Sequence, residues 1–222
     1  MKPYQFVFVA VYMPIVIMYL FSETSGNFKR RAVNKITMAA MFMLFALVEL
    51  LRRESRSPLD ILLMAGIIFS FLGDVVLLWD FVKGGVLFMI GNFLYTGYFL
   101  LRVINHGITG GNAIWIVILT AIPVAMFLYW CYTGFVNLGK LKVFKAYIAS
   151  ITMAASCGLV LMYSMKTMRT NFMGIGILLF MISDYFLSLH KFRNKDSKMY
   201  LRCNSFTYFT GMMLIALSMG ML

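Results

Sequence analysis

The stretch Ser70–Trp79, SFLGDVVLLW, is an apolar run that contains one carboxylate, Asp74. A similar stretch, Phe180–Leu189 with the sequence FMISDYFLSL, contains Asp184. Placing an aspartate in the hydrocarbon of a bilayer costs about 2.5–3.5 kcal/mol on insertion scales, so such residues usually face a protein interior and serve a function. Two apolar runs with carboxylates in matching positions therefore predict membrane-spanning helices that share a functional site.

The composition of the whole chain supports a membrane protein. Of the 222 residues, 62% are hydrophobic and 13% are charged, whereas soluble domains have about 45–50% and about 25%. The formal net charge is +12, but basic residues in a membrane protein collect in loops and set its orientation. We therefore expect membrane lipids rather than nucleic acid as partners. Cys131, Cys157 and Cys203 form no CxxC motif and no Cys/His cluster, so we expect no disulfide framework, no metal and no cofactor.

Apolar segments of membrane-spanning length follow one another along the chain. A helix needs about 20 apolar residues to cross a hydrocarbon core of about 30 Å. The segments predicted are Tyr4–Ser22, Ile36–Leu51, Leu59–Trp79, Gly84–Ile104, Ala113–Tyr132, Val143–Met165, Asn171–His190 and Tyr200–Leu222. The second is short, and we expect it to extend back to Ala32 with Lys35 at the membrane interface. The connections are too short for another domain, so we expect residues 1–222 to form a single integral membrane domain.

The predicted fold class is all-α, a polytopic bundle of about eight transmembrane helices. The matching Asp74 and Asp184 stretches suggest two four-helix halves that point the same way. Thirteen of the 20 lysines and arginines lie in or beside the connections after the first, third, fifth and seventh segments. The positive-inside rule places this end in the cytoplasm and both termini outside, in a plasma or inner membrane.

Depth along the helices indicates which polar side chains accompany the two aspartates. Counting inward from the same end brings the following residues to the layer of Asp74 and Asp184: Asn92, Tyr95, Tyr147, Ser205, Thr207 and Tyr208. Ser70 shares a helix face with Asp74, and Ser183 and Gly73 are the small residues directly before the aspartates. We expect a pocket open toward the inner leaflet, with Asp74 and Asp184 as catalytic residues. We expect its substrate-binding residues to include Asn92, Tyr95, Tyr147, Tyr208, Ser70 and Ser183.

Structural roles are the alternative for these residues. Each aspartate alone could hydrogen-bond a tyrosine or an amide and hold two helices together, and each tyrosine alone could be an interfacial residue. Among the other acids, we expect Glu23, Asp60 and Asp80 to be solvated at helix ends, and Glu49 to pair with Arg53 four residues later. A Ser-His-Asp hydrolase is disfavoured because the chain has no G-x-S-x-G motif and no well-placed histidine.

Four pieces of the sequence resemble one family, the YhhN-like lysoplasmalogenases, which are membrane proteins of about eight helices. They are FSFLGDVVLLW (69–79), GGVLFMIGNFLYTGYF (84–99), AYIASITMAAS (146–156) and MGIGILLFMISDYFLSL (173–189). The resemblance implies that Asp74 and Asp184 occupy the family's two acidic positions, and that Tyr95 and Tyr147 match its tyrosines. The family often has a histidine where this chain has Asn92, and often Tyr-x-x-Gln in the last helix, where Tyr208 is followed by Gly211.

The activity implied by this resemblance is cleavage of the vinyl-ether bond of a lysoplasmalogen into a fatty aldehyde and a glycerophospho-alcohol. Protonation of the vinyl-ether β-carbon followed by attack of water requires one protonated carboxyl and one carboxylate. The sequence leaves open which aspartate has which role. Lys145, Lys142 or Arg193 at the cytoplasmic rim is a candidate to bind the substrate phosphate. The alternatives are a proton-coupled transporter, since paired carboxylates in repeated halves also describe proton relays, and a lipid-binding protein without turnover.

Overall fold

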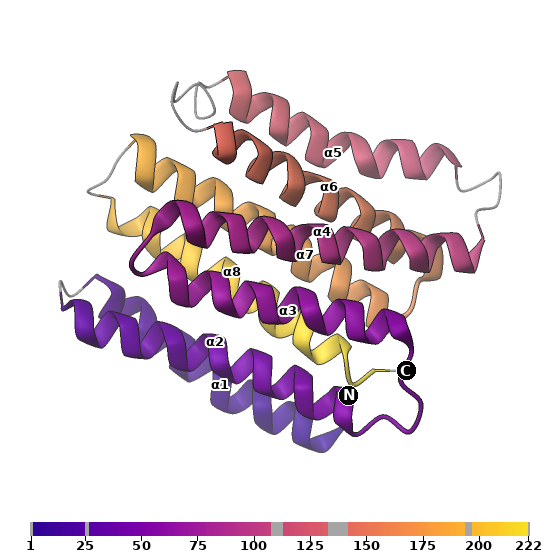
Figure 1. Ribbon diagram of the computed structural model, residues 1–222, viewed down its shortest axis with the longest axis horizontal. Helices are drawn as coiled ribbons and strands as arrows, with labels where there is room; N and C mark the ends of the chain where they lie inside the picture. Colours follow the sequence, from indigo (N-terminus) through magenta and orange to yellow (C-terminus); the bar gives the residue numbers. More distant parts are fainter. Residues whose placement is uncertain (1, 25–26, 108–112, 133–141, 194–196, 222) are drawn as a thin grey trace.

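The computed structural model describes residues 2–24, 27–107, 113–132, 142–193 and 197–221, and in them the chain is almost entirely helical (Figure 1). Eight α-helices correspond one by one to the predicted segments. They are α1 (Pro3–Glu23), α2 (Phe28–Leu51), α3 (Pro58–Leu77), α4 (Phe81–His106), α5 (Ala113–Tyr132), α6 (Lys142–Met165), α7 (Met168–Ser188) and α8 (Lys198–Ser218). A π-helical turn, Leu189–Arg193, continues α7. The predicted all-α class is confirmed.

Helix length and composition identify a multi-pass membrane protein. Among the described helices, α1, α2, α3, α4, α6 and α7 are long and apolar enough to cross a bilayer. Both termini lie at one end of the bundle, and α3 and α7 both run from that end toward the opposite one (Figure 1). Asp74 and Asp184, each near the end of its helix, are thereby brought to the same end of the molecule.

The start of α2 differs from the sequence-based expectation. The helix begins at Phe28, where the side chain of Asn27 accepts a hydrogen bond from the N–H of Arg30 at 3.1 Å. An asparagine at this position is a strong helix N-cap signal. Two turns of helix therefore precede Ile36, and Lys35 is largely buried in the bundle, with 14% of its side chain exposed.

The centre of the bundle is formed by α3, α4, α7 and α8, with α1 and α2 on one side and α6 and α5 on the other (Figure 1). Helices α7 and α8 approach most closely at two glycines. A Cβ atom on Gly211 would lie 2.6 Å from the carbonyl oxygen of Gly176. Membrane helices commonly pack backbone to backbone through such small residues, because lipid supplies no hydrophobic force between them.

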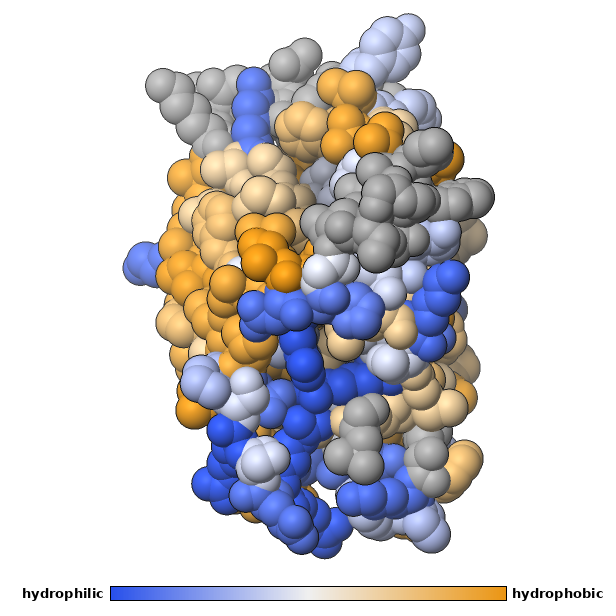
Figure 2. Space-filling view, turned by 90° about the vertical axis from the view of Figure 1, so that its right-hand side faces the viewer, coloured by the Kyte–Doolittle hydropathy of each residue, from blue (hydrophilic) through white to orange (hydrophobic). Residues whose placement is uncertain are grey.

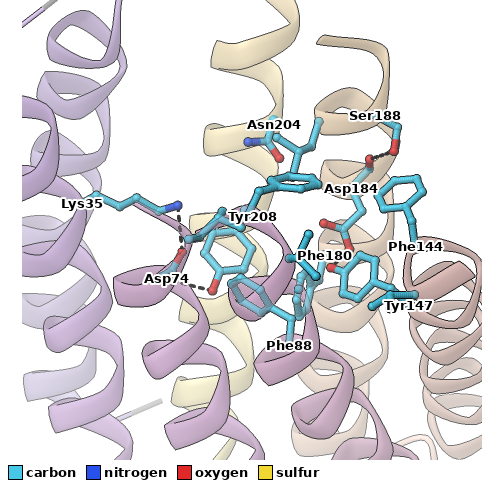
Figure 3. Close-up of a pocket in the computed structure, with 16 residues that line it drawn as sticks. Lys35, Asp74, Phe88, Phe144, Tyr147, Phe180, Asp184, Ser188, Asn204 and Tyr208 are labelled. Carbon is cyan, nitrogen blue, oxygen red and sulfur yellow. Dashed lines mark hydrogen bonds and ion pairs between the residues drawn. The ribbon is translucent and has the colours of Figure 1, made fainter. Parts of the chain in front are cut away.

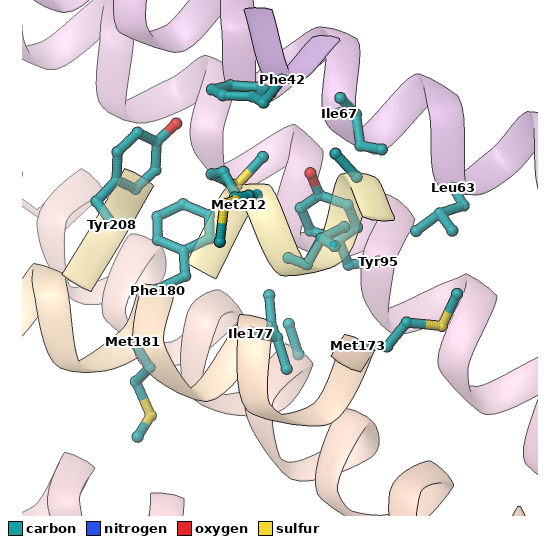
Figure 4. Packing of buried hydrophobic residues seen from close by; sticks show 14 of the residues in the cluster. Phe42, Leu63, Ile67, Tyr95, Met173, Ile177, Phe180, Met181, Tyr208 and Met212 are labelled. Carbon is teal, nitrogen blue, oxygen red and sulfur yellow. The ribbon is translucent and has the colours of Figure 1, made fainter. Parts of the chain in front are cut away.

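The buried apolar core runs along these central helices (Figure 4). Tyr95, Ile177 and Met212 are completely buried, and Phe180 and Tyr208 continue the same cluster toward the end opposite the termini. Phe180 and Tyr208 belong both to this core and to the lining of the cavity described below. The packed core consequently positions one wall of that cavity.

A buried ionic group, the arginine cluster of Arg53, Asp60 and Arg169, closes the end that carries the termini. Figure 2 looks onto this end, where hydrophilic side chains gather. Asp60 Oδ2 lies 3.0 Å from Arg53 and Oδ1 is hydrogen-bonded to Arg169. Arg53 also donates to the carbonyl oxygens of Met219 and Met221. The cluster thus joins α3, α7 and the end of α8.

Three expectations about acidic residues were wrong for a common reason. Asp60, expected to be solvated, is 2% exposed and paired with two arginines. Glu23 is also buried and accepts hydrogen bonds from Tyr19 and Ser205. Glu49 accepts from Tyr4 and Gln5 rather than pairing with Arg53. In each case at least one partner comes from a different helix, and sequence spacing does not show that partner.

Candidate active site

A cavity opens at the end of the bundle opposite the termini, and its walls come from six helices (Figure 3). Its empty volume is about 710 Å³, which includes open solvent at its mouth. Asp74 and Asp184 both line it, and most of the remaining lining is apolar or aromatic. We refer to it as the carboxylate cavity.

Asp74 forms one polar side of the carboxylate cavity. The residue is 1% exposed. Its Oδ1 lies 3.2 Å from the ammonium nitrogen of Lys35 on α2, and its Oδ2 accepts a hydrogen bond of 2.6 Å from the phenol of Tyr208 on α8. Both carboxylate oxygens therefore have a strong donor, one of them a cation.

Asp184 forms the other polar side and has a different set of partners. Its Oδ2 accepts a hydrogen bond of 2.6 Å from the phenol of Tyr147 on α6. Within the described ranges, no lysine, arginine or histidine lies within ion-pair distance of this carboxyl. The hydroxyl of Ser188 donates to the backbone carbonyl of Asp184 and not to its side chain. Asp184 is thus a buried carboxyl with a phenol as its polar partner.

Three aromatic rings lie between the two carboxyls (Figure 3). Phe88, Phe180 and Tyr208 pack edge to face, with ring centroids 5.1–5.9 Å apart, a favourable geometry for aromatic pairs. Gly73 makes room for this group, because a Cβ atom there would lie 2.8 Å from the ring of Phe88. The small residue before Asp74 therefore seats the apolar wall between the carboxyls.

A second group of aromatic side chains connects the cavity lining to the π-helical turn. Phe81 and Phe144 line the cavity, and Phe192 on the π-helical turn packs edge to face against both, at 6.3 and 4.9 Å. The ammonium of Lys191 lies 4.9 Å from the centre of the Phe81 ring. π-helical turns of this kind are frequent at functional sites.

The structure brings together part of the predicted site. Asp74, Asp184, Tyr147 and Tyr208 line the carboxylate cavity. The other predicted residues lie outside its lining. Ser70 and Tyr95 hydrogen-bond to each other at 3.0 Å, Ser183 donates to the Phe180 carbonyl, Asn92 donates to Ser150, and Lys145 is exposed on α6. A role in substrate binding for these five residues stays a prediction.

Sequence reasoning missed three polar residues of the lining, Lys35, Ser188 and Asn204. Lys35 is the most important because it contacts Asp74. The signal that would have found it is Asn27: an N-cap there starts α2 early and places Lys35 two turns inside the helix, at the depth of the aspartates. Of the candidates for a rim cation, Lys145 and Arg193 are not part of the described lining, and the side chain of Lys142 lies outside what the structure describes.

Comparison of the sequence with known protein families shows the family to which this chain belongs. The model of the YhhN family matches residues 30–219. The chain belongs to the YhhN family. Neither the curated proteins nor the solved structures provide a match. The matched range of the YhhN family includes both aspartates together with Lys35, Tyr147 and Tyr208.

The structure accounts for one of the two departures from the resemblance to YhhN-like lysoplasmalogenases. Gly211 stands where a glutamine is often found, and the carbonyl of Gly176 leaves no space for a side chain at that point of α8. Asn92 stands where a histidine is often found. It is fully buried and its amide nitrogen donates to Ser150 at 3.1 Å, while its Oδ1 has no partner among the described residues. In this YhhN-family chain, Gly211 therefore serves helix packing.

Proposed function

We propose that this YhhN-family chain is a membrane-embedded lipid hydrolase that cleaves the vinyl-ether bond of a lysoplasmalogen. The observation that carries the proposal is that Asp74 and Asp184, from two separate helices, line one largely apolar cavity in different electrostatic settings. Pairs of carboxyls whose surroundings differ are the usual arrangement for acid and base at neutral pH. The products are a fatty aldehyde and a glycerophospho-alcohol.

The chemistry requires two carboxyls and water. A protonated carboxyl transfers its proton to the β-carbon of the vinyl ether, and the adjacent carbon becomes an oxocarbenium ion. The second carboxyl, ionised, stabilises this cation and accepts a proton from the attacking water. When the resulting hemiacetal breaks down, the first carboxyl, now ionised, accepts the proton of the hemiacetal hydroxyl. The second carboxyl gives its proton to the leaving oxygen of the glycerol, so that the aldehyde and the free alcohol form. One water is consumed and the carboxyls regain their starting protonation states.

The lining of the carboxylate cavity suits the apolar chain of a lipid. Phe88, Phe180 and Leu187 offer apolar walls to a hydrocarbon chain. We further propose that the cavity end faces the cytoplasm and the termini the outside of a plasma or inner membrane, because most basic residues lie at the cavity end. Membrane-impermeant labelling of a cysteine placed at either terminus tests this orientation.

Aldehyde release from a pure lysoplasmalogen tests the proposal. The purified full-length chain in lipid nanodiscs is expected to release aldehyde from the vinyl-ether lipid. It is expected to leave the matched saturated alkyl-ether lysolipid intact, since that lipid cannot form the cation by protonation at carbon. Asp74→Asn and Asp184→Asn are each expected to abolish release, whereas Asp80→Asn, at the partly exposed start of α4, keeps it. Full turnover by both variants at the cavity would overturn the assignment.

A proton-coupled carrier is the second candidate, and the buried ion pair of Lys35 and Asp74 is the observation that favours it. Ionisable residues that pair inside a membrane often belong to proton pathways. Proteoliposomes distinguish the two functions. Uptake of a lysolipid driven by a pH gradient, with the lipid recovered unchanged, supports the carrier. Aldehyde formation that continues without a gradient supports the hydrolase.

A further inference from the structure

The two carboxyls of the cavity differ in how many of their oxygens already have partners. Both oxygens of Asp74 are engaged, Oδ1 by the Lys35 ammonium and Oδ2 by the Tyr208 phenol. Asp184 accepts one hydrogen bond at Oδ2, and no described residue bonds to its Oδ1. Since Asp184 lines the cavity, its Oδ1 is the carboxyl oxygen that is available to a bound molecule.

The titratable groups around the carboxyls come from every surrounding helix. Those that interact electrostatically with Asp74 are Tyr12 and Tyr19 on α1, Lys35 on α2, Tyr95 on α4, Tyr147 on α6, Asp184 on α7 and Tyr208 on α8. Among them Lys35 is the one cation. Its ammonium contacts Asp74, at 3.2 Å, and has no ion pair with Asp184 in the described part of the chain. The single positive charge among the described lining residues is thus assigned to one of the two carboxyls of the cavity.

Burial has opposite consequences for the two aspartates. A charge removed from water is stable when an opposite charge and hydrogen bonds compensate it, and an isolated one takes its neutral form. Asp74 has this compensation from Lys35 and Tyr208, whereas Asp184 has a phenol alone. A neutral Asp184 that accepts the Tyr147 hydrogen bond at Oδ2 carries its proton on Oδ1, the oxygen available in the cavity.

We infer that Lys35 divides the roles of the two carboxyls: it holds Asp74 as the carboxylate, and Asp184 is the protonated acid that donates from Oδ1. Lys35 acts through Asp74 and is a positioning residue. Tyr147 orients the acid and Tyr208 the carboxylate. The role of Asp184 as a proton donor to the substrate rests on the proposed function, whereas the protonation states of the two aspartates do not.

Infrared spectroscopy of the whole protein tests the protonation states without any turnover. Protein labelled with ¹³C at the aspartate carboxyls, in nanodiscs at neutral pH, is expected to show the C=O stretch of one protonated aspartic acid in a buried site. Asp184→Asn is expected to remove this band, and Asp74→Asn to retain it. A band that survives in Asp184→Asn, or that disappears in Asp74→Asn, overturns the assignment.

Variants of Lys35 test whether this residue keeps Asp74 ionised. In Lys35→Met the carboxyl of Asp74 loses its cation and takes up a proton, so a second protonated band is expected, whereas Lys35→Arg retains the charge and one band. The double variant Lys35→Met/Asp74→Asn replaces the ion pair by neutral groups and is expected to return to the single band of Asp184. This double variant also shows that the bundle still folds without the pair. Equal spectra for Lys35→Met and Lys35→Arg contradict the inference.

The kcat and the pH–rate profile of the same variants provide an independent test of the role of Lys35. Lys35→Met is expected to lower kcat by about 10²-fold at neutral pH, the usual contribution of one acid–base group, and to move the acidic limb of the pH–rate profile to higher pH. Lys35→Arg is expected to restore most of the rate and the original profile. A purely structural lysine would change stability and leave the profile in place. If the bands behave as expected but no aldehyde forms, the hydrolase proposal fails and the assignment of charge stands.

Discussion

Asp60 and Asp74 lie on the same helix, α3, near its two ends, and both are buried beside cations. Asp60 is held by two arginines, one at each oxygen, and lines no described cavity. Asp74 is held by one lysine and one tyrosine and lines the carboxylate cavity. Arginine's planar fork suits a rigid structural pair, whereas lysine is a point charge on a flexible stem. The comparison separates a carboxylate that joins helices from one that lines a cavity, for which we propose a role in chemistry.

The largest expected effect is on activity at the cavity end. Asp184→Asn is expected to lower the rate of aldehyde release by about 10²–10⁴-fold, the range for a lost general acid, with little change in thermal unfolding. Asp74→Asn is expected to lower the rate similarly. Asp60→Asn serves as the matched change at the other end of α3, and the protein that remains folded is expected to keep its activity per molecule. A comparable loss of specific activity in Asp60→Asn would contradict the distinction between a structural Asp60 and a catalytic Asp74.

The next effect is on stability at the end with the termini. Asp60→Asn leaves Arg53 and Arg169 without their anion, and breaking a buried ion pair in this way costs about 3–5 kcal/mol. We expect a clear fall in Tm, measured by thermal unfolding in detergent, and freer motion at the end of α8, whose carbonyls Arg53 holds. Asp80→Asn is the control, because that side chain is partly exposed and asparagine also caps a helix.

Gly73→Ala tests whether the shape of the carboxylate cavity beside Asp74 matters for activity. The added methyl would lie 2.8 Å from the Phe88 ring, so the ring must move and the aromatic wall between the carboxyls is disturbed. Overpacking of this kind costs about 1–3 kcal/mol, and we expect aldehyde release to fall about tenfold. Gly85→Ala is the control within the same cavity, since a Cβ atom there meets nothing within 4 Å. Equal activity of the two variants would contradict a role of the Phe88 ring position in aldehyde release.

The smallest expected effect comes from single phenols. Tyr147→Phe removes the donor that orients Asp184. Since a hydrogen bond of this kind contributes about 0.5–1.5 kcal/mol, kcat is expected to fall by about threefold to tenfold. Tyr4→Phe removes a phenol from Glu49 at the opposite end and is expected to lower Tm slightly without changing kcat. Steady-state kinetics and thermal unfolding of both variants decide whether the two ends are independent.

Local sequence patterns were sufficient for the helices and for four of the seven polar residues in the described cavity lining, Asp74, Asp184, Tyr147 and Tyr208. Every predicted segment overlaps a helix, because membrane-spanning length and hydropathy are properties of single segments. Depth counting placed Tyr147 and Tyr208 beside the aspartates, and the structure pairs each of them with one aspartate. The same method also selected Asn92 and Tyr95, which lie outside the cavity lining. Depth is set by position along a helix, but the direction of a side chain is set by how the helix is rotated against its neighbours.

The sequence by itself determined that this chain is an all-α, multi-pass membrane bundle with two carboxyls at one depth. Only the tertiary structure decided how the charges are paired: Lys35 with Asp74, two arginines with Asp60, and a phenol alone with Asp184. The physical reason is that hydropathy acts on each segment separately, whereas an ion pair requires two side chains from different helices within about 4 Å. The difference between the structural and the candidate catalytic aspartates is therefore a property of helix packing.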